Sequence, residues 1–293
     1  MFAYACRLVS RFTRPVIIFT RFYDKTVQCG CGAFIVLNDE GWILTAAHLW
    51  KSFFAYKEHS KQIAEYNEKV RAIQSNPGLD AKQKSERLRR LKSNPRWITN
   101  HSFWWGWDGV TVEDIRFLPE GDIAVGRLDP YDPKMVETYP VIKDPTSNLD
   151  IGTSLCRLGY PFLQIEATFD EKNCTFELAP GTLPLPRFPI EGIYTRNAMA
   201  GKSRDGKYEI KFLETSSPGF RGQSGGPVFD VKGTVWAIHS RTAQLPLGFG
   251  PGEKKDGRET EEKQFLNVGL GVHPELIVAF LRDNGIRFNL SDY

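Results

Sequence analysis

No run of apolar residues in this 293-residue chain is long enough to cross a bilayer. The longer runs, such as "PVIIF" and "ELIVAFL", fall well short of a spanning helix. At the N-terminus, "MFAYACRLVSRFTRP" is interrupted by Arg7 and lacks a small-residue cleavage site, which makes it a poor signal peptide. The net charge of +3 is too small to indicate a nucleic-acid partner. These absences predict a cytoplasmic protein that binds neither membrane nor nucleic acid.

Cysteines are few, and their pattern fits neither a disulfide framework nor a metal site. The five are Cys6, Cys29, Cys31, Cys156 and Cys174, an odd number at irregular spacing. The spacing of Cys29-Gly-Cys31 is shorter than that of ordinary zinc ligands, and the sequence contains no second cysteine pair that could complete a zinc site. We therefore expect mostly buried free thiols in a reducing compartment, and no metal.

Short strands dominate what the chain does contain. From residue 15 it reads as brief β-branched or aromatic runs separated by Gly, Pro, Asn and Asp, such as "CGAFIVLN", "DIAVGRL" and "GTVWAIHS". This pattern favours barrels or sandwiches over a βα repeat. The closing stretch "HPELIVAFLRDNG" predicts a helix that starts near Pro274 and stops at Gly285. Residues 244–264 are rich in Pro and Gly and then charged, so we expect a mobile loop there.

A basic helical segment interrupts this pattern over residues 51–96. Apolar residues recur on one face at Ile63, Tyr66, Val70 and Ile73, and "NPGLD" separates a second helical run to Leu91. The segment has 12 Lys and Arg against 5 Asp and Glu. It is either a solvated helical pair with its apolar stripe on the barrel, or a docking or sensing arm for a regulatory protein, whose basic face could meet an acidic protein or nucleic acid.

Three tryptophans follow this segment in "SFWWGWDGV", at Trp104, Trp105 and Trp107. We expect them to pack under the helical insertion or across a hairpin. The alternative is a hydrophobic site for a partner.

The stretch "PGFRGQSGGPVFD", residues 218–230, surrounds one serine with small or turn-forming residues. Gly222, Gly225 and Gly226 would let the backbone coil tightly beside Ser224 and leave its N–H groups open to another molecule. A nucleophile beside an oxyanion hole requires such a backbone. A glycine-rich hairpin is the simpler alternative.

A nucleophilic serine also needs a base and a group that orients the base. His48 stands in "GWILTAAHLW", where an apolar strand breaks into small residues. Asp122 stands in "EGDIAVGRL", at the start of another apolar strand. Taken singly, the first could be a core histidine and the second a turn aspartate. Together with Ser224 they form a candidate catalytic triad.

The blocks "ILTAAH", "DIAVGRL" and "GQSGGPVFD" resemble the signature motifs of chymotrypsin-fold (trypsin-like) serine peptidases. The bacterial HtrA/DegP-type and stand-alone branches look most similar, and the likeness extends over about residues 15–280 outside the insertions. It implies an all-β fold of two packed Greek-key six-stranded β-barrels, with a helical hairpin inserted in the first barrel and a C-terminal helix. Residues 1–14 would be an N-terminal extension, residues 15–140 the first barrel and residues 141–293 the second.

The resemblance also implies roles for individual residues. Ser224 would be the nucleophile, His48 the general base and Asp122 the residue that holds the imidazole tautomer. The backbone N–H groups of Gly222 and Ser224 would form the oxyanion hole. The chain would then be a serine endopeptidase that cleaves protein or peptide substrates through an acyl-enzyme, without metal or organic cofactor. The alternative is a chymotrypsin-fold binding or scaffold protein whose triad is idle.

Several positions depart from relatives of this kind. Leu49 follows the histidine where secreted members have a cysteine, so Cys31 has no disulfide partner there. Gln223 replaces the aspartate that pairs with a new N-terminus in zymogens. The chain stops at Tyr293, without the PDZ module of HtrA-type enzymes, so we expect substrate capture to lie elsewhere. Loops around residues 187–221 and 242–264 could hold the enzyme latent until a partner rearranges them.

The substrate pocket is predicted from residues near the serine. Pro218 occupies the position where trypsins hold an aspartate, which argues against cleavage after Lys or Arg. His239 falls where glutamyl endopeptidases and some viral relatives carry a pocket histidine, and Arg241 would line the same wall. These side chains would favour Glu, Asp or Gln at P1, the residue before the scissile bond. Gly219 stands where those families usually have threonine. The alternative is that His239 bonds a buried group.

Overall fold

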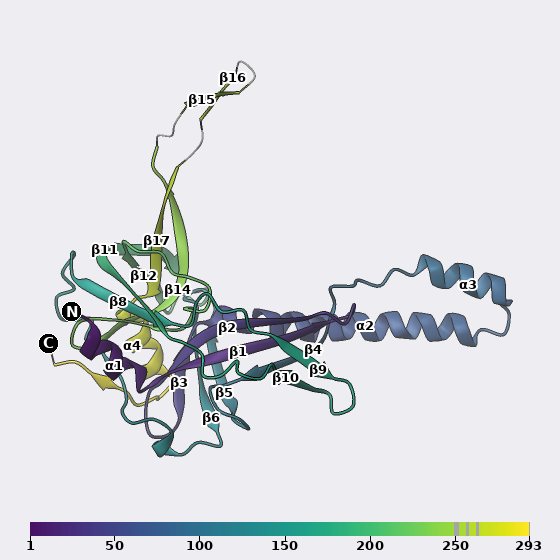
Figure 1. Cartoon of the computed structure of the whole chain (residues 1–293), viewed down its shortest axis with the longest axis horizontal. Helices are drawn as coiled ribbons and strands as arrows, with labels where there is room; N and C mark the ends of the chain where they lie inside the picture. The colour runs from purple at the N-terminus through teal and green to yellow at the C-terminus, as the bar shows by residue number, and fades with distance from the viewer. Residues whose placement is uncertain (249–251, 256–257, 262–263, 293) are drawn as a thin grey trace.

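The structure, a computed structural model, describes residues 1–248, 252–255, 258–261 and 264–292. Two antiparallel β units form its body, and two extensions project from it (Figure 1). The first unit is a curled sheet in the order β4-β1-β2-β3-β6-β5. Its strands are β1 (Thr13–Phe22), β2 (Val27–Val36), β3 (Trp42–Thr45), β4 (Ile98–Trp104), β5 (Thr111–Leu118) and β6 (Ile123–Asp129).

The second unit closes into a ring of six strands. Its order is β13-β8-β11-β12-β17-β14, and β13 also pairs with β14. Two short strands, β7 and β18, extend it beyond β14. The bounds are β7 (Val141–Ile142), β8 (Ser154–Gly159), β11 (Phe188–Lys202), β12 (Glu209–Thr215), β13 (Pro227–Phe229), β14 (Val235–Pro246), β17 (Phe265–Val272) and β18 (Asn289–Leu290). The expected all-β fold with two six-stranded units is confirmed. Among the described residues, however, the first unit stays open because β4 and β5 do not pair.

The helical insertion is confirmed as a long arm, whose first part lies beside β4 and whose outer part projects beyond the sheets (Figure 1). It consists of α2 (Lys51–Ser75) and α3 (Ala81–Arg90), and a capping box between Asp80 and Gln83 starts the second helix. The stripe at Ile63, Tyr66, Val70 and Ile73 is half-buried, but no residue of either helix is fully buried. Helix α2 packs on β4 and the end of β1 as far as Tyr66, whose ring lies 5.7 Å from that of Trp97.

The tryptophan cluster packs inside the first unit, as expected. Trp105 is buried, with its ring 5.3 Å from that of Trp50 and 5.4 Å from that of Phe34. Trp107 lies under the Arg14 guanidinium, and Trp104 Nε1 donates to Asp108. The cluster thus packs beneath the start of α2 through Trp105, while Trp104 and Trp107 stay partly exposed.

Residues 244–264 differ from the expected loop over the part that the structure describes. Strands β14 and β17 continue pairing to Pro246 and Phe265, and β15 (Gly252–Lys255) pairs with β16 (Arg258–Glu261) in a projecting hairpin. Alternation of apolar and polar residues in "SRTAQLP" suits an extended strand, and the sequence reading gave more weight to the Gly and Pro that follow. Residues 249–251, 256–257 and 262–263 of this prediction lie outside the described residues.

Helices near both ends of the chain contribute to a core that contains residues of both units. Residues 1–14 contain a helix, α1 (Ala3–Ser10), whose Ala5 and Val9 are buried in the core that includes the second unit, with Phe2 against Phe229. The C-terminal helix α4 (Pro274–Asp283) is confirmed and ends before Gly285, whose φ is +67°.

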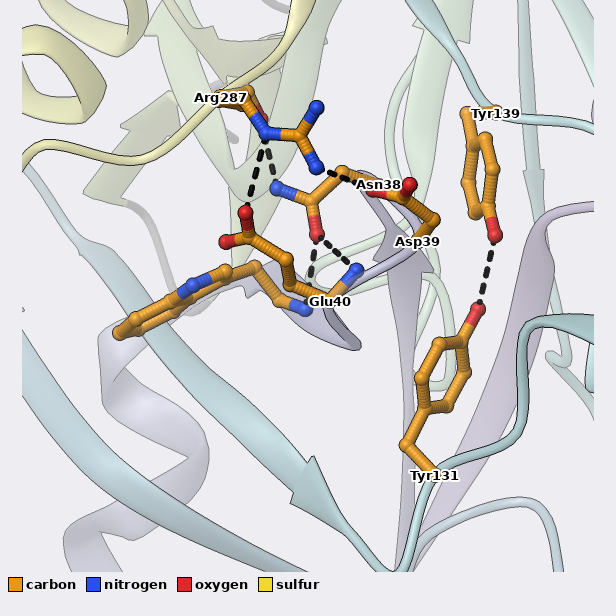
Figure 2. A network of polar contacts seen from close by, with 7 residues as sticks. Asn38, Asp39, Glu40, Tyr131, Tyr139 and Arg287 are labelled. Carbon is orange, nitrogen blue, oxygen red and sulfur yellow. Dashed lines mark hydrogen bonds and ion pairs between the residues drawn. The ribbon is translucent and has the colours of Figure 1, made fainter.

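After α4 the chain returns to the first unit. Arg287 forms ion pairs with Asp39 and Glu40, and its carbonyl accepts a hydrogen bond from Asn38 Nδ2 at 2.8 Å (Figure 2). Asn38 in turn accepts from the Glu40 and Trp42 N–H groups, which shapes the turn between β2 and β3. This Arg287 clamp joins the two units at the turn that leads into β3.

Two shorter elements complete the description. A 3-10 turn at Pro133–Met135 lies on the connection between the units. A small hairpin of β9 (Ala167–Asp170) and β10 (Thr175–Leu178) lies against β2.

Candidate active site

His48 lies in a 3-10 turn (Ala47–Trp50) that directly follows β3. Strand β3 is buried throughout, so the chain reaches His48 from a rigid core. The His48 N–H donates to Asp122 Oδ1 at 2.9 Å, and Nδ1 of the ring lies 2.8 Å from Asp122 Oδ2. This double attachment fixes both the backbone and the ring. With Nδ1–H donating to the carboxylate, Nε2 is the nitrogen that can accept a proton.

Asp122 is held by its own turn at the start of β6. Its φ is +54°, a left-handed conformation that costs a non-glycine residue free energy. The Asp122 N–H donates to the Pro119 carbonyl at 3.1 Å, and its carbonyl accepts from the Ala47 N–H at 3.3 Å. The aspartate is 8% exposed. These contacts aim a buried carboxylate at His48.

Ser240 also contacts the Asp122 carboxylate, a role that was not predicted from the sequence. Its hydroxyl donates to Asp122 Oδ2 from the buried part of β14, in the second unit. The available signal was the hydroxyl that directly follows His239 in "AIHS". Ser240 thus adds a second hydrogen bond to the carboxylate oxygen that His48 Nδ1 contacts, which helps to fix the orientation of Asp122.

The loop before Ser224 is a tight turn that only glycine permits at Gly222. The φ of Gly222 is +95°, and a side-chain carbon there would lie 2.1 Å from the Tyr160 carbonyl oxygen. The turn closes through a 3.0 Å bond from the Gln223 N–H to the Phe220 carbonyl. The Gln223 side chain is buried and accepts from the Phe220 N–H at 3.0 Å. Gln223 therefore ties the loop to itself, a role that its position before the serine did not reveal.

Ser224 sits where the two units meet. Its carbonyl accepts a 2.8 Å hydrogen bond from the Ala33 N–H of β2. At Gly225, whose φ is +79°, a side-chain carbon would lie 2.2 Å from the Ala33 carbonyl oxygen. The glycine after the serine therefore allows the second unit to contact the first. This close approach brings Ser224 to the His48 side of the interface.

Ser224, His48 and Gly222 line one cleft of about 770 Å³, called the main cleft here. Within the part of the chain that the structure describes, the N–H groups of Gly222 and Ser224 donate to no other group. In that same part, no hydrogen bond joins the Ser224 hydroxyl to the His48 ring. Such contacts are often long without substrate and shorten in the complex.

A second cavity of about 500 Å³, the side cavity, lies against the other face of His48. Its walls include Asp122, Ser240 and Arg241, and the apolar side chains Phe54 and Phe117. The His48 side chain therefore borders both cavities.

The three expected pocket residues do not share one wall. His239 is buried, and its ring lies where a side chain at Gly219 would be, since a carbon there would fall 1.9 Å from Nε2. The Arg241 guanidinium lies 4.5 Å from the Phe212 ring centroid and lines the side cavity instead. The expectation that Arg241 lines the wall of His239 thus differs from the structure. The ladder is irregular between the two residues, which breaks the alternation that would place them on one face.

Arg157 is a buried cation near His239 and Pro218, and its role was not predicted from the sequence. Its Nη1 donates to the Pro218 carbonyl at 2.8 Å and its Nη2 to Thr215 Oγ1 at 2.6 Å. It is 2% exposed, and no carboxylate among the described residues pairs with it. Burial lowers the pKa of Arg157 to about 10, so it stays charged at neutral pH. A single arginine inside the apolar strand "SLCRLG" was the available signal.

Burial also sets the charge of His239. It lowers the pKa of His239 well below the usual range, and the nearby Arg157 and His48 act in the same direction. The imidazole is therefore neutral, and its Nδ1 has no hydrogen-bond partner among the described residues. Thr242 covers this wall, because its hydroxyl accepts from the Gly219 N–H at 2.9 Å and donates to the Gly219 carbonyl at 2.7 Å.

The described residues contain no group of three or more His, Cys, Asp or Glu side chains placed to hold a metal ion. Within the same residues, no helix has both the length and the apolar character needed to cross a membrane.

Comparisons with known proteins agree with the motifs. A family model for the trypsin-like peptidase domain matches residues 30–238, which include His48, Asp122 and Ser224. A comparison with curated proteins gives no match. Among solved structures, the chain is similar to the Rv3671c protease from M. tuberculosis in its active form, at 11% identity and a TM-score of 0.48, over 98% of this chain and 86% of that one. It is also similar to AlgW, an HtrA-type protease solved with a tripeptide, at 14% identity and a TM-score of 0.45, over 95% of this chain and 62% of that one.

Proposed function

Because the chain belongs to the trypsin-like peptidase family and is a serine endopeptidase, we propose that Ser224, His48 and Asp122 are its catalytic residues. The observation that carries this proposal is the two-point attachment of His48 to a buried aspartate in the cleft that also holds Ser224. Substrates are proteins or peptides.

The reaction follows from this arrangement. Ser224 Oγ attacks the scissile carbonyl while His48 Nε2 takes its proton, and Asp122 holds the imidazolium that forms. The oxyanion lies against the N–H groups of Gly222 and Ser224. His48 then gives its proton to the leaving amine, and water hydrolyses the acyl-enzyme by the same route. None of these steps requires a metal or an organic cofactor.

We also propose a preference for Glu, Asp or Gln at P1. The wall formed by Gly219, His239 and Thr242, called the P1 wall here, is backed by Arg157, a buried cation without a carboxylate partner among the described residues. A P1 carboxylate would supply that missing counter-charge, and the neutral His239 ring would add a hydrogen bond. Arg157 thus takes the role that the sequence reading gave to Arg241.

Turnover in the free enzyme is proposed to be low until a partner acts. What supports this is the Thr242 hydroxyl, whose two hydrogen bonds tie β14 to Gly219, so a rearrangement that opens the P1 wall would break them. The partner surface is proposed to be residues 51–96, because α2 and α3 are exposed and α3 carries Arg87, Arg89 and Arg90 in its last turn. An acidic protein surface would suit that charge. A cytoplasmic location also remains a proposal, which rests on the sequence.

Labelling by a fluorophosphonate probe tests the catalytic proposal. Wild type should label at Ser224, whereas Ser224→Ala and His48→Ala should not, and both variants should keep the wild-type melting temperature. A folded wild type that stays unlabelled with and without candidate acidic partners would instead indicate an idle scaffold. A peptide library varied at P1 then tests specificity, and a preference for aliphatic or basic residues would contradict the acidic P1 proposal.

A further inference from the structure

Three phenylalanines form an exposed aromatic group, the aromatic rim, beside the proposed nucleophile. Phe162 is 71% exposed and Phe188 is 41% exposed. The Phe162 ring lies 5.3 Å from that of Phe188 and 4.9 Å from that of Phe220. Exposed aromatic side chains that gather at a cleft mark a binding site more often than chance exposure does. Phe162 and Phe220 also line the main cleft together with Ser224.

The backbone at Phe162 is strained. Its φ is +62°, a conformation that bulky residues rarely adopt. Strain of this kind persists when neighbouring structure enforces it, and it gathers at functional sites. Here Tyr160, two residues before Phe162, is buried, and its N–H donates to the Gly222 carbonyl at 2.8 Å. The turn that holds the oxyanion loop therefore also presents Phe162.

The opposite wall of the main cleft is apolar and uncharged. It includes Ile18 and Leu49 and the two thiols Cys29 and Cys31. Burial raises the pKa of Cys29 to about 11 and that of Cys31 to about 12, so neither is a thiolate at neutral pH. Lys51 and Arg221 lie at the exposed edge of the cleft. Their charged ends can stay in water while their stems cover apolar surface.

From these observations we infer that the main cleft is a subsite for a bulky apolar side chain of the substrate, on the leaving-group side of the scissile bond. The inference rests on the proposed function. The acyl side of the substrate is assigned to the P1 wall, and none of its three residues lines the main cleft. An apolar residue at the first or second position after the scissile bond would cover Phe162 and bury its ring. The aromatic rim thus selects where along a protein the enzyme cuts.

Cleavage of a peptide library varied on both sides of the scissile bond tests the inference. Wild type should prefer Phe, Leu or Ile at the first or second position after the bond. Phe162→Ala should lower kcat/KM for those peptides by about tenfold and leave peptides with Gly there unchanged. Phe188→Ala, which removes a rim ring from β11, is a second variant should the first fail to fold. Met199→Ala is the matched control, since Met199 is 57% exposed on β11 and lines neither cavity.

Two further readouts separate the failure of this inference from that of the proposed function. The small fluorophosphonate probe reads Ser224 alone, so wild type and Phe162→Ala should label at equal rates. Labelled enzyme with no apolar preference after the bond would overturn the subsite and leave the catalytic proposal intact. If wild type neither labels nor cleaves, the catalytic proposal fails, and calorimetric titration with Phe-Leu amide decides the subsite. Saturable binding lost in Phe162→Ala supports it, and no binding overturns it.

Discussion

Replacing Gly222 by alanine would remove one oxyanion donor while changing a single methyl group. The added carbon would lie 2.1 Å from the Tyr160 carbonyl oxygen and 3.1 Å from Pro161 Cα, so the turn must shift. Keeping alanine at a φ of +95° costs a further ~1–2 kcal/mol. A shift that turns the N–H away from the oxyanion costs about 2.7–4 kcal/mol in the barrier, or roughly 10²–10³ in kcat. We expect that loss in kcat with little change in KM.

Gly201→Ala is the matched control for this substitution. Gly201 has a φ of +98°, but nothing lies within 4 Å of the carbon that alanine would add. It carries the same backbone strain without touching the serine loop. Both variants should melt a few degrees below wild type, since ~1–2 kcal/mol lowers the Tm of a chain of this size only modestly. Steady-state kinetics on one peptide decide the matter. Wild-type kcat in Gly222→Ala, or an equal loss in Gly201→Ala, would refute the assignment of the oxyanion hole.

Two other predictions concern Ser240 and the buried histidines. Ser240→Ala removes a hydrogen-bond donor from the Asp122 carboxylate, which orients His48, so kcat/KM should fall roughly 10- to 100-fold. Ser240→Thr keeps the hydroxyl and should restore much of the loss. Equal kinetic constants for Ser240→Ala and wild type would contradict this role. Burial lowers the pKa of His101 and His273 from an unfolded value of 6.5 to about 4, and it also lowers the pKa of His239. Their contribution to stability is therefore complete above pH 6.5 and is lost as the pH falls toward 4, by up to about 1.4 kcal/mol per pH unit for each histidine. Urea denaturation at pH 7.5, 6 and 5 measures this, and a constant free energy of unfolding across that range would contradict it.

The all-β architecture was predictable because it rests on local patterns. Apolar alternation and turn residues marked the strands, and the stripe from Ile63 to Ile73 marked the long helix. The N-terminal helix was not predicted, since its short "AYACRLVS" run gains its stability by burying Ala5 and Val9 on the far unit. Tertiary packing of that kind leaves little trace in local sequence.

The candidate site likewise contains residues that local motifs predict and residues that only long-range contacts reveal. Motif residues such as Ser224 and His48 stand in small-residue contexts that a sequence displays directly. Ser240 and Arg157 act through contacts between segments 118 and 58 residues apart, which spacing alone does not reveal. Arg241 was assigned to the wall of His239 by strand alternation, and the irregular register between them broke that rule.

The N-terminal helix and the Arg287 clamp described above have a consequence for how the enzyme unfolds. The N-terminal helix packs on the unit that carries Ser224, while the Arg287 clamp returns the C-terminal segment to the unit that carries His48. The two units cannot separate without breaking the contacts of the N-terminal helix and of Arg287. They should therefore unfold in one cooperative step rather than as two domains. Removing the N-terminal helix or replacing Arg287 would then act at a distance, because either change loosens the junction on which nucleophile and base depend for their alignment.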